Sequence, residues 1–210
     1  MNSRTALAIS LLSLIAGSAS ASVATYTAAE SQMGSQTNIA DFNDLVVQQS
    51  LFEYQEDGLQ VSTNRDYFSW NAPGLDGTEM YYANTGSLEL VDITKVDGSN
   101  FNDVEMQVGS GWTPDAIGLV YIWVQAYADG SLVAEFDIDM LSGEYLGLTG
   151  GEFDQIKIGS YADAASRDLH DDTLRNAIAI DNLSVGTVVP APGTLMIPAL
   201  AGIGLVRRRR

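Results

Sequence analysis

Hydrophobic and polar residues alternate over short stretches along the middle of the chain. Gly, Asn and Asp separate these stretches, and none is long with the 3.6-residue period of a helix, which is typical of strands joined by turns. Ten stretches are expected to be strands: residues 37–42, 59–63, 67–70, 80–83, 87–94, 103–108, 119–128, 131–140, 153–161 and 177–185. Residues 143–151 and 162–175 are expected to be loops, the second with one helical turn. Because strands do not alternate with helices, the pattern predicts an all-β fold, an antiparallel β-sandwich or jelly roll.

One hairpin can be worked out from its turn. Asp129-Gly130 is a strong two-residue turn signal, and regular pairing outward from it places Trp123 opposite Phe136. Paired residues share a sheet face, and the face expected in the core carries Tyr121, Trp123, Tyr127, Leu132, Phe136 and Ile138. The other face is expected to carry Ile122, Val124, Ala126, Val133, Glu135, Asp137 and Asp139. An alternative stays open, in which the three aromatic residues at alternate positions form a platform for stacking a sugar.

The first 21 residues have the pattern of a cleavable secretory signal. Arg4 and the amino terminus precede an apolar run over residues 6–16, and Ala19-Ser20-Ala21 then provides a small-residue cleavage site. The apolar run is shorter than the roughly 20 residues that a membrane span needs. We therefore expect the export machinery to translocate the chain and signal peptidase to cleave it after Ala21.

The last segment, residues 188–210, combines three features in a fixed order. Pro190-Ala191-Pro192 comes first, an apolar run over residues 195–206 follows, and Arg207, Arg208, Arg209 and Arg210 end the chain. As a helix the apolar run would be about 18 Å long, against a hydrocarbon core of about 30 Å. The arginines would stay on the cytoplasmic side, so we expect a weak, transient inner-membrane anchor with the preceding domain outside.

This order of features resembles the C-terminal sorting signal of the PEP-CTERM proteins, which are bacterial envelope proteins processed by exosortase, a membrane cysteine peptidase. The family motif is Pro-Glu-Pro, from which Pro190-Ala191-Pro192 departs. Residues 39–45, 92–101 and 179–185 resemble short sequence segments of the β-sandwich ectodomains that often precede this signal. The resemblance implies removal of the tail by an exosortase-type peptidase, a place at the cell surface or in the extracellular matrix of a biofilm, and a jelly roll of the carbohydrate-binding kind.

Charge narrows the possible partners of the part between the two ends. All 27 acidic residues lie between residues 22 and 189 with only 5 of the 10 basic ones, a net charge of −22. Such a charge repels nucleic acid and anionic membranes. Cysteine is absent, which excludes disulfides and thiolate metal sites. Residues 22–36 are polar and weakly patterned, and are expected to be a flexible leader to one sandwich domain over residues 37–187.

Residues suited to catalysis are few. His170 is the one histidine, in a polar loop, and no G-x-S-x-G motif accompanies it. One histidine cannot build a multi-histidine zinc site. Glu135, Asp137 and Asp139 project from one strand face at steps of about 7 Å, which permits a glycosidase pair, but a chain this acidic has such rows by chance. The sequence predicts that the protein is not an enzyme.

Two kinds of binding site have candidates. The oxygen-bearing side chains of Asp41, Asn43, Asp44 and Asp181 suit a structural calcium ion if the first and last strands are neighbours, as they commonly are in a jelly roll. Trp70 and Trp112 adjoin Pro-containing turns, where each could stack on a sugar or cover the core. The sequence therefore predicts an exported, non-catalytic surface or matrix protein, with a polysaccharide-binding module, stabilised by calcium, as the alternative.

Overall fold

The computed structural model describes residues 22–45, 50–71, 75, 77–83, 90–110, 118–169 and 175–188. Several predicted features lie outside these residues, namely the signal peptide with Ala19 and Ala21, the sorting signal with Pro190, Ala191, Pro192 and Arg207 to Arg210, and also Trp112 and His170. The side chain of Trp70 is likewise outside the description, although its backbone belongs to a strand.

The described part of the chain consists of strands and one short helix. The elements are β1 (Ala24–Ala28), β2 (Met33–Ala40), β3 (Ser50–Glu56), β4 (Leu59–Asn71), β5 (Glu79–Ala83), β6 (Val91–Lys95), β7 (Phe101–Ser110), β8 (Leu119–Ala128), β9 (Ser131–Leu141), β10 (Tyr145–Phe153), β11 (Gln155–Tyr161), α1 (Ala164–Asp168), β12 (Arg175–Asn176) and β13 (Ile178–Val188). The strand pairs within this part are antiparallel. The all-β prediction is confirmed, and α1 lies in the segment expected to contain one helical turn.

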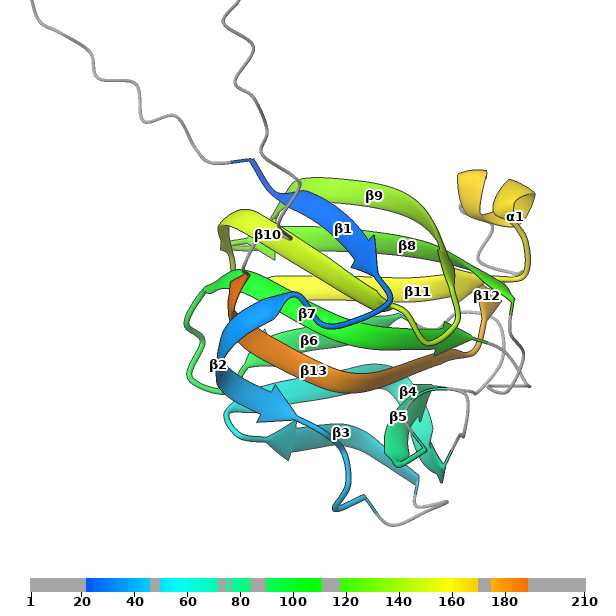
Figure 1. Cartoon of the computed structure of the whole chain (residues 1–210), viewed down its shortest axis with the longest axis horizontal. Helices are drawn as coiled ribbons and strands as arrows, with labels where there is room; N and C mark the ends of the chain where they lie inside the picture. The colour runs from blue at the N-terminus through cyan, green and yellow to red at the C-terminus, as the bar shows by residue number, and fades with distance from the viewer. Residues whose placement is uncertain are drawn as a thin grey trace, which may run out of the picture.

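The strands form two layers (Figure 1). One layer has the order β1-β10-β7-β13, and β13 pairs on its other edge with β5 and β2. The second layer has the order β9-β8-β11-β6-β4, with β3 beyond β4. Strand β4 pairs with β6 through residues 59–63 and with β5 through residues 68–71, so this one long strand links the layers.

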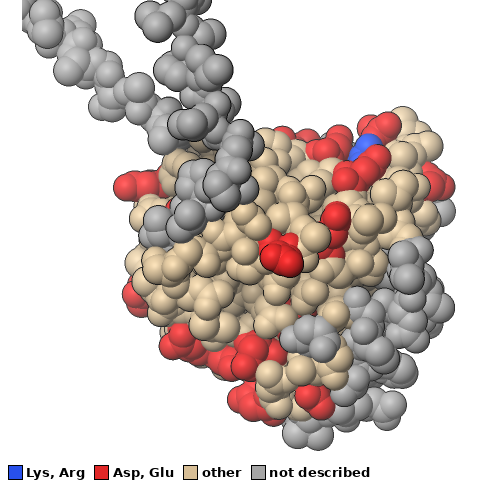
Figure 2. Space-filling model, in the orientation of Figure 1, with Lys and Arg blue, Asp and Glu red and all other residues tan. Residues whose placement is uncertain are grey.

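The surface carries the acidic excess of the sequence. Acidic side chains are spread over the face and rim seen in Figure 2. On that face, among the described residues, basic atoms are seen at one place, beside α1.

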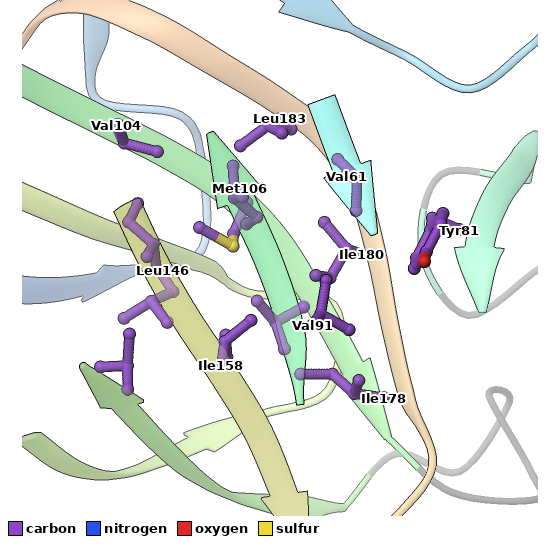
Figure 3. Packing of buried hydrophobic residues seen from close by; sticks show 14 of the residues in the cluster. Val61, Tyr81, Val91, Val104, Met106, Leu146, Ile158, Ile178, Ile180 and Leu183 are labelled. Atoms are coloured by element: carbon purple, nitrogen blue, oxygen red, sulfur yellow. The ribbon is translucent and has the colours of Figure 1, made fainter. Parts of the chain in front are cut away.

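The core lies between the two layers, and alternate residues of each strand enter it. Figure 3 shows Met106 of β7 and Ile180 of β13 in a common cluster with Val91 of β6 and Ile158 of β11. These four side chains are fully buried. Burying a side chain of this size stabilises the fold by about 1.5–3 kcal/mol. Burial of the alternating apolar side chains between the layers is therefore the main stabilisation of the sandwich.

The segment expected to be a flexible leader is instead part of the sheet. β1 pairs with β10 and β2 pairs with β13, so the chain between them crosses the outer face of the layer over β7 (Figure 1). We call residues 24–40 the N-terminal strap. The leader expectation is wrong because the strap is held by backbone pairing and by one buried carboxylate, which leave little hydrophobic pattern in its sequence.

Residues 143–151, expected to be a loop, mostly form β10. Three glycines, Gly147, Gly150 and Gly151, weaken the strand signal there. Gly147 is required by the strap, since a Cβ added to it would lie 2.0 Å from the Tyr26 ring. The residue type that hides this strand in the sequence is the one that lets the strap cross it.

The hairpin around Asp129-Gly130 forms, but its register differs from the expected one. Tyr127 pairs with Leu132, whereas Ala126 pairs with Ala134, so Val133 is an extra residue in β9. Such a bulge shifts all later pairs by one, and a one-residue shift moves a strand's side chains to the opposite face. The predicted faces of β8 are therefore wrong, and its core face carries Ile122, Val124 and Ala126, packed with Ala134, Phe136 and Ile138.

Candidate functional site: an aromatic sheet face

The bulge places a row of aromatic and amide side chains on the outer surface of the second layer. Four residues of β8 are on this side, and their partners on β9 and β11 follow from the strand register. We define the aromatic face as Tyr121, Trp123, Gln125 and Tyr127 of β8 with Glu135, Asp137 and Asp139 of β9, Gln155, Lys157 and Tyr161 of β11, and Asp92 of β6. The pairing that placed Tyr121, Trp123 and Tyr127 in the core does not occur. However, Trp123 is only 8% exposed, so the sugar-platform alternative retains two half-buried aromatics, Tyr121 and Tyr127.

Hydrogen bonds hold the middle of this face in place. The Tyr127 hydroxyl donates to Gln125 Oε1 at 2.6 Å, and Gln125 Nε2 donates to Glu135 Oε2 at 2.7 Å. Gln125 is 8% exposed, whereas Glu135 is exposed. The phenol ring, the amide and the carboxylate are therefore oriented before any ligand arrives, which lowers the entropic cost of binding.

The same row continues across β11 to β6. Gln155 Nε2 donates to Asp92 Oδ1 at 2.8 Å, and Lys157 Nζ lies 3.9 Å from the same oxygen. Lys157 Nζ is also 5.3 Å from the centroid of the Tyr127 ring, a cation–π distance. From β9 to β6 the row spans about 14 Å at the usual strand spacing. Burial raises the pKa of Asp92 above its ordinary value, against the lowering effects of Lys157 and Gln155.

Helix α1 lies against one end of the aromatic face. Arg167 hydrogen-bonds Asp139 and Asp168, and its Nε lies 3.8 Å from Asp137 Oδ1. Arg167 and Trp123 are each 8% exposed, and α1 contacts β8, β9 and β11. The Tyr121 end of the face is therefore beneath α1, and the Tyr127 end is away from it.

These contacts bear on the carboxylate row that permits a glycosidase pair. As expected, Glu135, Asp137 and Asp139 lie on one face of β9, and all three are exposed. However, Asp137 and Asp139 both contact the guanidinium of Arg167, which is the arrangement of a structural ion pair.

The residues expected to bind calcium are engaged in separate hydrogen bonds. The Asp41 carboxylate accepts from Asn43 N at 3.1 Å, and Asp44 accepts from the Tyr54 hydroxyl. Asp181 is fully buried in β13 and accepts from Asn182 N at 2.7 Å. The strand expected first in the sequence, residues 37–42, does neighbour the last one, since Ala40 of β2 pairs with Leu183 of β13, although β1 precedes it in the chain.

A carboxylate that the sequence did not single out, Glu56, shares the Tyr54 hydroxyl with Asp44. Glu56 Oε2 lies 2.8 Å from the Tyr54 hydroxyl and accepts from Phe42 N at 3.1 Å. Burial raises the pKa of Glu56, the two hydrogen bonds oppose this, and Asp41 and Asp44 add to it. Among the described residues no group of three or more His, Cys, Asp or Glu side chains is arranged to hold a metal ion, so the calcium site stays a prediction.

Glu105 is a second buried carboxylate that sequence patterns did not indicate. It is fully buried on β7 and accepts from the Tyr26 hydroxyl at 2.6 Å, from Gln32 N at 2.8 Å and from the Ser31 hydroxyl. All three donors belong to the N-terminal strap. Burial, followed by this contact, raises the pKa of the Tyr26 hydroxyl well above its ordinary value. The role of Glu105 is therefore to fasten the strap, and only the crossing of the chain could have revealed it.

One recess among the described residues is lined by no residue of the aromatic face. It has a volume of about 880 Å³ and is lined by Ser22, Val23, Asn102, Asp103, Ala128, Val133, Thr149, Gly150, Gly151 and Glu152. None of these lining residues is aromatic, so the described part of this recess offers no surface for stacking.

Of the predicted sugar-binding residues, Trp70 lies in β4 opposite Met80.

Comparison with known proteins adds no relative. No protein-family model matches the chain, and no curated protein matches it. None of the helical residues that the structure describes forms a helix long and apolar enough to cross a membrane.

Proposed function

We propose that this chain is exported, that both its ends are removed, and that the folded part acts without catalysis at the cell surface or in the extracellular matrix. The observation that carries this is where the described strands begin and end. β1 starts at Ala24, just after the expected cleavage at Ala21, and β13 ends at Val188, just before Pro190. Cleavage at both expected sites would leave every described strand intact.

The sorting signal and the finer fold belong to the same proposal. An exosortase-type peptidase is the partner that would process Pro190-Ala191-Pro192, and signal peptidase is the partner at Ala21. A jelly roll is supported by two strand orders, β2-β13-β7-β10 in one layer and β6-β11-β8-β9 in the other. Neighbours that are far apart in the sequence, in two four-strand groups, are typical of paired Greek keys.

The aromatic face favours a second element of function, the binding of polysaccharide. Sites for small polar ligands combine aromatic surface with a few oriented polar groups. Tyr127, Gln125 and Glu135 form such a group through two hydrogen bonds. A sugar ring stacked on Tyr127 would have an amide and a carboxylate within reach of its hydroxyl groups.

Intact mass of the protein recovered from its native cell surface and medium tests the processing. We expect loss of residues 1–21 and of the segment beyond Pro192. A protein that still ends in Arg210 would refute the sorting proposal, and any added mass would identify what the mature protein is attached to.

Titration calorimetry with a panel of polysaccharides tests the binding element. We expect Tyr127→Ala to weaken binding about two- to twelvefold, since an aromatic contact contributes about 0.5–1.5 kcal/mol. Tyr145→Ala, the same substitution on β10 of the other layer, is the matched control and should leave affinity unchanged. If the unaltered protein binds no member of the panel, the polysaccharide element is refuted and the matrix role stands without it.

A further inference from the structure

The aromatic face has an excess of negative charge. Asp92, Glu135, Asp137 and Asp139 are its carboxylates, and Lys157 is its own cation. Lys157 lies 3.9 Å from Asp92. The cation that α1 adds, Arg167, contacts Asp137 and Asp139 and also Asp168 of its own helix. Lys157 and Arg167, the described basic residues of this face, are thus each paired with carboxylates. The net charge of the face is negative and would repel a carboxylate on a ligand.

The chain's own side chains show what this surface accepts. The ammonium group of Lys157 lies between the Tyr127 ring, at 5.3 Å from its centroid, and the Asp92 carboxylate. A cation placed over an aromatic ring is attracted by the negative ring face, and a neighbouring carboxylate adds to that attraction. A primary ammonium group therefore fits this combination of ring and carboxylate, and at the other end of the face the guanidinium of Arg167 contacts the carboxylates of Asp137 and Asp139.

Glu135 offers a similar place at the exposed end. Its carboxylate is joined to the Tyr127 hydroxyl through one residue, Gln125, which bonds both. Glu135 is exposed, so its carboxylate is open to solvent beside the aromatic ring.

We infer that the aromatic face binds a polysaccharide whose sugars carry free amino groups, with a sugar ring against Tyr127 and an ammonium group against Glu135. This inference rests on the proposed polysaccharide binding and names its ligand class. The overall charge favours the same ligand, because residues 22–189 carry a net charge of −22 and attract a polycation at long range. A polymer of uronic acids is disfavoured by both the local and the overall charge.

Titration calorimetry with three oligosaccharides of equal length tests the inference on the exported protein expressed from the full chain. The probes are an oligomer of glucosamine, its fully N-acetylated form, which is neutral, and an oligomer of a uronic acid, all at pH 6 and low salt. We expect the glucosamine oligomer to bind most tightly, the acetylated form more weakly, and the uronic acid not at all. Raising the salt should weaken only the first.

Two substitutions separate this site from general attraction to an acidic protein. Glu135→Gln should weaken binding of the glucosamine oligomer about threefold, the effect of an exposed ion pair, and should weaken binding of the acetylated form by a smaller factor. Glu152→Gln removes one exposed carboxylate from β10 in the other layer, and it should change neither affinity.

The outcomes distinguish the inference from the proposal beneath it. Equal affinity for the glucosamine and acetylated oligomers, or equal effects of the two substitutions, would overturn the amino-sugar assignment while polysaccharide binding stands. Tighter binding of the uronic acid would overturn it as well. Binding of none of the three, together with a negative wider panel, would refute both.

Discussion

Gly147 is the position at which one added methyl group should test how the N-terminal strap is held. Gly147 of β10 pairs with Tyr26 of β1 on one side and with Glu105 of β7 on the other. The Tyr26 ring therefore lies across Gly147, and its hydroxyl reaches Glu105 at 2.6 Å. A Cβ at residue 147 would be 2.0 Å from the ring, a distance that no ring can tolerate, so Gly147→Ala must displace Tyr26.

The cost follows from what the displaced ring loses. A hydrogen bond to a charged acceptor contributes about 1.5–3 kcal/mol, and crowding in a packed site costs about 1–3 kcal/mol. Replacing a strand glycine by alanine returns roughly 0.5–1 kcal/mol of backbone entropy. We therefore expect Gly147→Ala to lower the free energy of unfolding by about 2–5 kcal/mol, a large share of the usual 5–15 kcal/mol.

Urea unfolding, followed by circular dichroism, of four proteins measures this: the unaltered chain, Gly147→Ala, Tyr26→Ala and the double variant. Once the ring is absent, Gly147→Ala should be neutral or stabilising by up to about 1 kcal/mol. The two changes should therefore couple by about 2 kcal/mol or more. Additivity within about 0.5 kcal/mol would show that Tyr26 does not cross Gly147 and would refute the description of the strap.

Three further changes test other parts of the structure. Arg167→Ala should lower the free energy of unfolding by about 1–3 kcal/mol and make α1 more susceptible to proteolysis. Arg167→Lys should retain only part of this stability, because one ammonium group cannot contact both Asp137 and Asp139 as a guanidinium does. Unchanged proteolysis of Arg167→Ala would contradict this. The raised pKa of Glu56 means that the folded state binds the proton of this group more tightly than the unfolded state does. The contribution of Glu56 to the free energy of unfolding should therefore be fully present below the ordinary pKa of 4.5 and be lost as pH rises through the raised pKa. Urea unfolding of Glu56→Gln across this pH range should lack this contribution, and parallel pH curves for both proteins would be evidence against it. Deleting Val133 removes the bulge without changing any core face, so thermal unfolding should report a cost under about 1 kcal/mol, and a loss above 3 kcal/mol would mean that the bulge itself is needed.

Local patterns predicted some elements well and others poorly, for identifiable reasons. Strands with one apolar and one polar face, such as β7 and β13, were evident because burial of alternate residues leaves a period of two. β10 was taken for a loop because Gly147, Gly150 and Gly151 stand where a strand usually has branched or aromatic residues. Residues 22–36, which include most of the strap, were taken for a flexible leader because Glu105, the main side-chain partner of the strap, is more than 70 residues away in the sequence.

The candidate site shows the same limit. Both faces of β8 are apolar, with Ile122 and Val124 on one and Tyr121 and Trp123 on the other, so hydrophobicity alone could not choose between them. The turn at Asp129-Gly130 was identified correctly, but regular pairing from it gave the wrong choice. The outward position of Glu135 and Asp137 was predicted correctly, but which residues of β8 pair with them depends on the register, and only the bulge at Val133 makes these partners Gln125 and Trp123.

The sequence by itself determined the all-β class, the location of most strands and the turn of the central hairpin, because these depend on residues close together in the chain. It also carries the two end patterns from which export and sorting are proposed. Only the tertiary structure decided that the first strands cross the sheet to reach Glu105, and which side of β8 is the core. Regular pairing from the turn and pairing with Val133 bulged out place opposite sides of β8 in the core, and both sides are apolar. Packing against the opposite layer chooses the second.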